Sequence, residues 1–234
     1  MWIENDAGTT LRKAVSGKLR DLYWNRAQWF MEQAVSLNPP NEEHSKRLQE
    51  YADKILKIVD KLGRAADKNN IMVEAREMFY DEDFVEKLDT NAYLLSFKNG
   101  VIDFKQKCFR KGYPEDYLSL CTDNDYIPID EERDAETIAE INDFMEKLFP
   151  VKEIRDYMWE HLASVLIGNS ALNQTFNMYI GDGRNGKSAL MDLMTTCLGK
   201  YKGDVPLPLI TDRRTKIGGV CPEIVDLKGV RLAV

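Results

Sequence analysis

Cysteine and histidine are scarce in this 234-residue chain, which has four cysteines and two histidines. The cysteines form no C-x-x-C pair, so a zinc site is not expected, and isolated thiols are typical of a reducing compartment. No apolar run reaches the roughly 18 residues that a membrane helix needs, and the N-terminus lacks the apolar core of a signal peptide. We therefore expect an intracellular protein without membrane contact.

The composition, with 44% hydrophobic and 30% charged residues, is typical of a globular protein of one large or two modest domains. Its net charge of −7 is unevenly distributed: +1 over residues 1–80, −11 over 81–170 and +3 over 171–234. An acidic segment repels a phosphate backbone. Any contact with single-stranded DNA is therefore expected beyond residue 170 or outside this chain.

Residues 181–188 match G-x-x-x-x-G-K-[ST], the phosphate-binding loop of P-loop nucleoside triphosphatases. Glycines at both ends of the loop allow backbone N–H groups to point at the phosphates, and Lys187 supplies a positive charge to the β- and γ-phosphates. The Ser188 hydroxyl is a ligand for Mg²⁺. The residues expected to contact ATP are Gly181, Asp182, Gly183, Arg184, Asn185, Gly186, Lys187, Ser188 and Ala189.

The flanks of this loop support the interpretation. Residues 176–180 form an apolar and aromatic run typical of a buried strand. Residues 188–198 repeat apolar side chains at helical spacing, and Gly199 follows at the position of a C-terminal cap. Strand, loop and helix in this order predict a phosphate site at a helix N-terminus.

Helices are predicted over most of the remaining chain. Apolar residues recur at helical spacing in residues 10–37 and again in 42–67, and one or two shorter helices are expected between 71 and 88. Short strand-like runs around the Asn99-Gly100 turn then predict a β-hairpin or three-stranded meander at about 93–112. A polar connector, 114–134, leads to two helices near 135–148 and 151–167.

The expected fold class is α/β. Residues 1–134 would form a mainly helical module with the small β-hairpin, and 135–234 the N-terminal part of a P-loop (AAA+-like) ATPase domain. Residues 206–210 and 228–234 are strand candidates. The Walker B acid that holds Mg²⁺ in such ATPases would follow the second of these. The chain ends there, so we expect it to be part of a longer polypeptide and to hydrolyse little ATP alone.

Three stretches together resemble one family: residues 88–104, the loop 181–188 with 198–201, and 227–234. They are similar to the superfamily-three primase-helicases of large DNA viruses, phages and plasmids, the poxvirus-type group. In that family a leucine-aspartate and an asparagine-glycine-valine element precede the ATPase. Its loop typically carries the asparagine found here at Asn185, and a glycine-x-arginine strand leads to the Walker B acid.

The resemblance implies a replicative helicase that hydrolyses ATP with Mg²⁺ to move along single-stranded DNA as a homo-oligomeric ring, usually a hexamer. Lys187 would then be the catalytic residue and Ser188 the metal ligand. Residues from about Trp24 to Leu88, with the hairpin, would form the module preceding the motor. The implied location is a viral replication site in the host cytoplasm or nucleus, or the cytoplasm of a phage-infected bacterium.

Two other function classes stay open, a P-loop phosphotransferase and a non-catalytic module for nucleotide binding or oligomerisation. Among single residues, Trp24, Trp29 and Phe30 are expected in a core rather than stacked on bases, and His161 in helix packing. The basic residues Arg213, Arg214 and Lys216 are expected in a solvated loop. The acids Asp204, Glu223 and Asp226 do not match the position of a Walker B acid.

Overall fold

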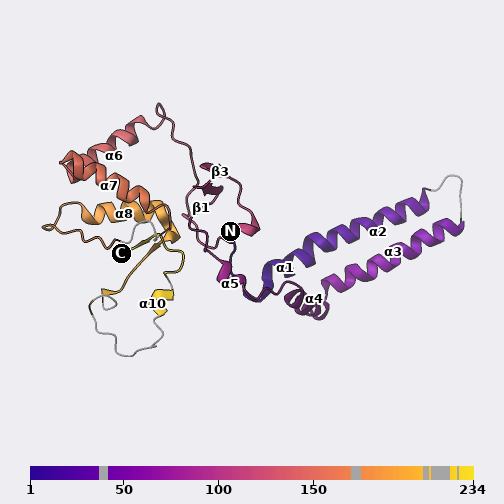
Figure 1. Cartoon of the computed structure of the whole chain (residues 1–234). Coiled ribbons are helices and arrows are strands. Elements are labelled where there is room, and N and C mark those ends of the chain that lie inside the picture. Colours follow the sequence, from indigo (N-terminus) through magenta and orange to yellow (C-terminus); the bar gives the residue numbers. More distant parts are fainter. Residues whose placement is uncertain (37–41, 170–174, 208–210, 212–221, 226) are drawn as a thin grey trace. The chain divides into compact units, whose positions relative to one another are not determined.

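The computed structural model of the chain describes residues 1–36, 42–169, 175–207, 211, 222–225 and 227–234. It divides into two compact units (Figure 1): residues 3–82 form a helical unit, and residues 1–2 with 83–234 form a larger unit. The larger unit is mostly helical with a small antiparallel sheet, so the expected α/β class is confirmed at this level. The boundary expected between residues 134 and 135 stays a prediction.

The helical unit is built around an antiparallel pair of long helices, α2 and α3, which run side by side in Figure 1. The helix predicted over 10–37 is present from Thr9 to Val35, with a π-helical turn (Val15–Leu19) inside it, and residue 37 lies outside the described residues. The helix predicted over 42–67 ends earlier because Arg64 takes an extended backbone conformation. The elements are α1 (Thr9–Ala14), α2 (Arg20–Val35), α3 (Glu42–Gly63) and α4 (Ala65–Met78).

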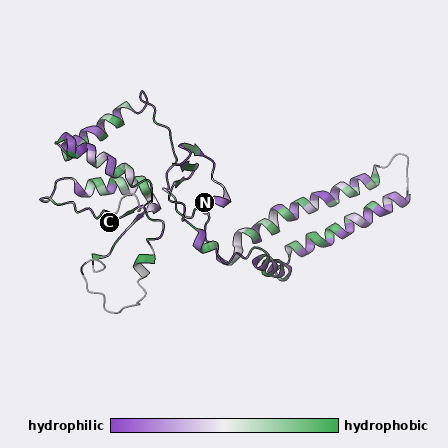
Figure 2. Cartoon of the chain, in the orientation of Figure 1, coloured by the Kyte–Doolittle hydropathy of each residue, from purple (hydrophilic) through white to green (hydrophobic). Residues whose placement is uncertain are grey.

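Small residues allow α2 and α3 to approach each other closely. Ala27 and Ala52 are fully buried, and Ala34, Val59 and Leu62 are almost fully buried. Figure 2 shows hydrophobic and hydrophilic residues interspersed along both helices. A pair of helices can bury only one stripe of each partner, so apolar side chains outside that stripe face solvent.

Two aromatic residues lie outside the buried stripe, and the sequence expectation for them was wrong. Trp24 is 48% exposed and Trp29 is 42% exposed, whereas Phe30 is half-buried. Helical spacing beside Leu22 indicated a core, but Leu22 itself is exposed. The apolar spacing of α2 therefore extends beyond the one face that α3 covers.

The larger unit contains the predicted three-stranded meander. Strands β1 (Leu94–Phe97), β2 (Gly100–Asp103) and β3 (Cys108–Arg110) pair antiparallel in sequence order, with Phe97 opposite Gly100 at the Asn-Gly turn. The short helix α5 (Phe84–Lys87) precedes this sheet. Helices α6 (Ala135–Leu148) and α7 (Lys152–Ser164) follow it and match their predictions closely.

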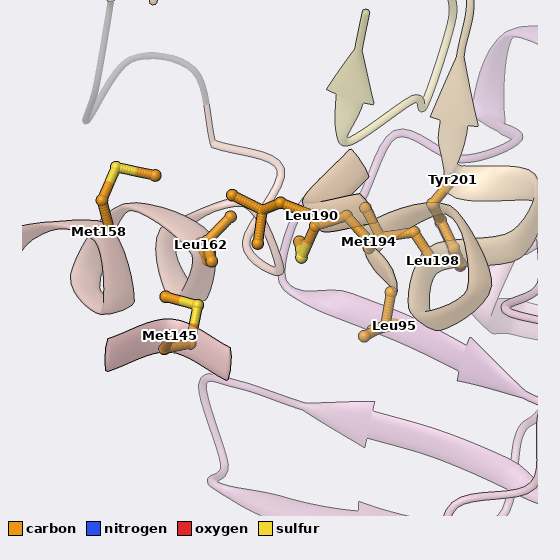
Figure 3. Close-up of a cluster of buried hydrophobic side chains, with 8 residues drawn as sticks. All are labelled: Leu95, Met145, Met158, Leu162, Leu190, Met194, Leu198 and Tyr201. Atoms are coloured by element: carbon orange, nitrogen blue, oxygen red, sulfur yellow. The ribbon is translucent and has the colours of Figure 1, made fainter. Parts of the chain in front are cut away.

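One hydrophobic core joins the meander to the helix after the glycine-rich loop, α8 (Lys187–Leu198). Figure 3 shows its buried side chains, which come from β1, α6, α7, α8 and the 3-10 turn after α8 (Gly199–Tyr201). Burying one such leucine or methionine stabilises a fold by roughly 1.5–3 kcal/mol. The core consists of Leu95, Met145, Met158, Leu162, Leu190, Met194, Leu198 and Tyr201.

A short parallel pair lies beside this core. Strand β4 (Lys202–Gly203) pairs with β5 (Leu232–Ala233), which occupies part of the strand predicted over 228–234.

The strand predicted at 176–180 is absent from the described structure, and its apolar residues Phe176, Met178 and Ile180 are exposed. A strand needs a hydrogen-bonding neighbour, and no described strand pairs with this run. The strand candidate at 206–210 lies largely outside the described residues.

A half-buried arginine, Arg231, connects the parallel pair to the meander. The Arg231 guanidinium donates to the carbonyl oxygens of Ala92 (2.6 Å) and Leu94 (2.8 Å), at the start of β1. Its backbone N–H donates to Tyr201 O at 2.7 Å, and its guanidinium carbon lies 5.4 Å from the centroid of the Tyr201 ring. Burial lowers the pKa of Arg231. Among described buried side-chain polar atoms, only Nε of Arg231 lacks a hydrogen-bond partner.

The residues just before Arg231 continue this contact. Lys228 Nζ donates to Val85 O (2.7 Å) and Glu86 O (3.3 Å) in α5. Gly229 has a φ of +77°, and a β-carbon there would lie 2.8 Å from Cβ of Asp89, so only glycine fits this turn. The whole run 228–231 therefore lies along residues 85–94.

Tyr201 makes a second connection between the same parts. Its side chain is 1% exposed, and its hydroxyl accepts a hydrogen bond from Ser96 N (3.1 Å) in β1 and donates to Leu120 O (3.3 Å). Burial raises its pKa to about 12, so the phenol stays neutral. The end of α8 is thereby held against the meander.

We expect Tyr201→Phe to destabilise the larger unit by about 1–3 kcal/mol, because it leaves the buried Ser96 N–H without an acceptor. Thermal and urea unfolding followed by circular dichroism would measure the loss. Tyr126→Phe is the matched control, because its hydroxyl makes no hydrogen bond to the described part of the chain. Equal stability of the two variants would contradict the role given to the Tyr201 hydroxyl.

A second stability prediction concerns Asp116, which forms a two-bond pair with Arg110 (2.8 and 2.9 Å). The hydrogen bond from Arg110 lowers the pKa of Asp116 below its usual 3.8. The pair therefore stabilises the fold fully above about pH 4, and this contribution disappears as pH falls through the lowered pKa. Asp116→Asn should cost about 1–3 kcal/mol at pH 7.

The difference between Asp116→Asn and the unaltered chain should shrink steadily as unfolding is measured from pH 5 towards pH 2. Asp143→Asn is a suitable control, because Asp143 pairs with Lys147 on an exposed helix face. A difference for Asp116→Asn that does not change with pH would contradict the electrostatic explanation.

Candidate nucleotide-binding site

The glycine-rich loop leads directly into α8, whose first residue is Lys187. Arg184 and Gly186 take left-handed backbone conformations, with φ of +65° and +82°. A β-carbon on Gly186 would lie 2.9 Å from Leu148 Cδ1, which can move aside, so this position requires glycine mainly for its left-handed backbone conformation. The loop therefore turns sharply onto a helix N-terminus, where unpaired N–H groups and the helix dipole favour an anion.

The Lys187 ammonium folds back over this loop. Its Nζ donates to the carbonyl oxygens of Gly181 (3.0 Å) and Asp182 (3.2 Å), and to Oδ1 of Asn185 at 2.6 Å. Three oxygen acceptors thus surround one cation at the mouth of the loop. Phosphate oxygens are acceptors of the same kind with more negative charge, so a bound phosphate can replace them.

Two cavities open beside the loop, and Lys187 lines both. One has a volume of about 640 Å³ and is bounded by α6, residues 178–180 and the loop, including Asn185. The other has a volume of about 1040 Å³ and extends from Ser188 and Asp192 to Arg231 and β5. Either volume is in or near the range of small-molecule sites. The described residues therefore fit a nucleotide whose phosphates lie at the start of α8, with the Ser188 hydroxyl available to a Mg²⁺ ion.

Aromatic rings line the approach to the larger cavity. His161 of α7 stacks on Tyr157, with ring centroids 6.2 Å apart, and meets Tyr179 edge-on at 6.4 Å. Burial raises the pKa of Tyr179. His161 therefore packs against neighbouring rings, as expected for a residue of helix packing.

The structure describes only some of the remaining acidic and basic candidate residues. Asp204 is exposed and forms an ion pair with Lys202. Arg213, Arg214, Lys216, Asp226 and the side chain of Glu223 lie outside the described residues. Within the described ranges, His, Cys, Asp and Glu side chains form no group of three that could hold a metal, and no helix is both long and apolar enough to cross a membrane.

Sequence reasoning missed the residues that hold this site in place. Asp89 accepts hydrogen bonds from the backbone N–H groups of Ser119 (2.8 Å) and Leu120 (3.2 Å), and also contacts the Ser119 hydroxyl. It thereby supports the turn against which Gly229 packs. The sequence did carry a signal for these positions, because Asp89 belongs to the leucine-aspartate element and Gly229 to the glycine-x-arginine element. Their mutual contact could not be inferred from positions 140 residues apart.

Comparison with known proteins identifies a family for this chain. The family model described as "D5 N terminal like" matches residues 1–150. A protein of Acanthamoeba polyphaga mimivirus named "Putative helicase" is 36% identical over 230 residues, covering 98% of this chain and 23% of its own length. A protein of Invertebrate iridescent virus 3 with the same name is 32% identical over 182 residues, covering 78% of this chain and 19% of its own length.

A more distant relative has a different name. A "Putative primase" of African swine fever virus is 23% identical over 200 residues, covering 81% of this chain and 20% of its own length. The chain thus spans about a quarter or less of each relative. The resemblance to primase-helicases of large DNA viruses is confirmed, and the chain belongs to the D5 N-terminal-like family.

Proposed function

We propose that this chain carries the ATP-binding loop of a replicative DNA helicase that uses ATP hydrolysis to move along single-stranded DNA. The observation that carries the proposal is the Lys187 ammonium, held over a sharply turned loop at the N-terminus of α8 and facing two cavities. This arrangement suits a nucleoside triphosphate because it combines a point charge, a helix dipole and free N–H groups at one place.

The chain's own residues would act on the nucleotide as follows. Lys187 would exchange its bonds to Gly181, Asp182 and Asn185 for bonds to the β- and γ-phosphate oxygens. It would then neutralise the charge that develops on the transferred phosphoryl group, which is the main electrostatic contribution in such reactions. The Ser188 hydroxyl would bind Mg²⁺, which supplies further charge neutralisation when present.

We propose that the protein acts as a homo-oligomer, a hexameric ring, in which a neighbouring subunit supplies a second cation to this site. The cationic groups that line the two cavities are Lys147, Lys187 and Arg231 among the described residues. Arg231 is already bonded to two carbonyl oxygens, so it is not free to reach a phosphate. Phosphoryl transfer usually needs a second cation near the γ-phosphate, which a neighbouring subunit can supply.

We expect Lys187→Ala to weaken binding of a fluorescent ATP analogue to the 234-residue chain at least tenfold, because the loop loses its only side-chain cation held at the phosphate position. In the intact gene product the same change should reduce DNA-stimulated ATP hydrolysis to less than a tenth. Steady-state phosphate release with and without single-stranded DNA measures this directly.

Lys200→Ala is the matched control for that experiment, because Lys200 is an exposed lysine just beyond the other end of α8. Unchanged nucleotide binding in Lys187→Ala would contradict the proposed ATP site. Hydrolysis that requires Lys187 but does not respond to DNA would instead favour a phosphotransferase. Nucleotide binding without any hydrolysis by the intact gene product would favour a non-catalytic module.

A separate prediction tests the metal. Ser188→Ala should remove most of the increase in nucleotide affinity that Mg²⁺ produces, while affinity measured in EDTA stays within about twofold, because only the metal ligand is lost. Titrations of the fluorescent analogue with and without Mg²⁺ give the comparison. A variant that responds to Mg²⁺ as strongly as the unaltered chain would show that the metal has other ligands.

A further inference from the structure

A cluster of aromatic rings and cations lies on one flank of the α2–α3 pair. The rings of Trp29 and Phe30 meet edge-on with centroids 5.0 Å apart, and Phe30 lies 5.9 Å from Tyr51 of α3. The guanidinium carbon of Arg26 lies 4.3 Å from the Trp29 centroid and 4.6 Å from that of Phe30. Lys54 Nζ lies 5.6 Å from the Tyr51 centroid. We call these five residues the cation–aromatic cluster.

The cluster is open to solvent. Trp29 is 42% exposed and Tyr51 is 54% exposed, and they flank the half-buried Phe30. Leu22 lies two helical turns before Trp29 on α2, and Ile58 lies two turns after Tyr51 on α3; both are also exposed. The flank is therefore a continuous surface contributed by both helices and not a single exposed ring.

Its cations are not neutralised by carboxylates. Within the described residues, neither Arg26 nor Lys54 forms an ion pair, whereas Arg47 of the same unit is paired with Glu43 at 2.6 Å. The acids of α2, Asp21 and Glu32, do not lie three, four or seven residues from Arg26. On α3, Glu50 lies four residues before Lys54 but forms no ion pair with it in the described structure. The positive charge of Arg26 is thus held on aromatic faces and directed to solvent.

We propose that the cation–aromatic cluster is a binding site for single-stranded DNA. Exposed rings stack on bases of any sequence, and neighbouring cations meet the phosphates, which is the usual composition of a single-strand site. The choice of DNA as ligand rests on the proposed helicase function. The site differs from the expectation drawn from segment charges, because residues 1–80 are nearly neutral in sum and the relevant charge is local.

Charge argues against a second copy of the same surface as the occupant. Self-association through this flank would bury Arg26 and Lys54 of both copies in one interface, and neither cation has a carboxylate partner in the described structure. Burying cations without such partners is unfavourable. A phosphate backbone instead offers one negative charge per nucleotide. The combination of unpaired cations and open rings therefore fits a single strand better than a symmetric protein contact.

The test is fluorescence anisotropy of a labelled 20-nucleotide oligothymidine titrated with the 234-residue chain, without nucleotide and at low salt. Trp29→Ala should weaken binding by roughly 5- to 150-fold, the range for loss of one stacked base. Arg26→Gln with Lys54→Gln should weaken binding and reduce its dependence on salt concentration. Trp29→Phe should restore most of the affinity lost in Trp29→Ala.

Trp24→Ala is the matched control, because Trp24 is 48% exposed on the same helix but has no cation over its ring in the described structure. It should bind within twofold of the unaltered chain. Circular dichroism and thermal unfolding would confirm that each variant retains its helices. Binding of duplex DNA should respond much less to Trp29→Ala, since paired bases cannot stack on the ring.

The proposal would be overturned if the chain did not bind the oligonucleotide, or if Trp29→Ala and Trp24→Ala behaved alike. A change of oligomer mass in Trp29→Ala, with DNA binding unaltered, would identify the flank as a protein interface instead. Lys187→Ala separates this result from the proposed function: it should bind DNA normally without nucleotide, whereas the cluster variants should bind the ATP analogue normally.

Discussion

The half-buried guanidinium of Arg231 makes the contacts on which the larger unit depends. Taking a cation out of water is costly, which is why burial lowers the pKa of Arg231. The Ala92 and Leu94 carbonyls and the Tyr201 ring offset that cost with two hydrogen bonds and a cation–π contact. Asp89 attracts Arg231 electrostatically but forms no ion pair with it in the described chain, so the position of Arg231 rests mainly on these backbone dipoles.

These contacts of Arg231 connect the meander to the helix that follows the glycine-rich loop. Tyr201 directly precedes β4 and Arg231 directly precedes β5, so both residues flank the parallel pair. Tyr201 bonds to Ser96 in β1, and Arg231 bonds to Leu94 in β1 and to Ala92 just before it. The N-terminal end of α8 carries Lys187. A shift of the meander would therefore move the helix that presents the ammonium. The meander is thus part of the frame that positions the start of α8.

Local sequence signals predicted the parts of this frame whose structure depends on neighbours in sequence. The Asn99-Gly100 turn, the bounds of α6 and the start of α8 all follow from turn chemistry and apolar spacing. The run 176–180 has the composition of a strand, yet strand formation depends on a neighbour that the described chain does not place there. The Arg231 contact depends on residues about 140 positions away, which a single sequence cannot indicate.

Exposure of aromatic residues in the helical unit has a simple physical origin and by itself indicates no ligand. Two helices cover only one stripe of each other, so apolar residues at other positions of α2 must face solvent, Trp24 among them. Trp29 differs from Trp24 in its neighbours and not in its exposure. A guanidinium stacked on an indole retains its charge and part of its donor capacity, so ring and cation are both available to one ligand. The placement of Arg26, and not the hydrophobicity of the helix, therefore distinguishes a binding surface from an incompletely buried one.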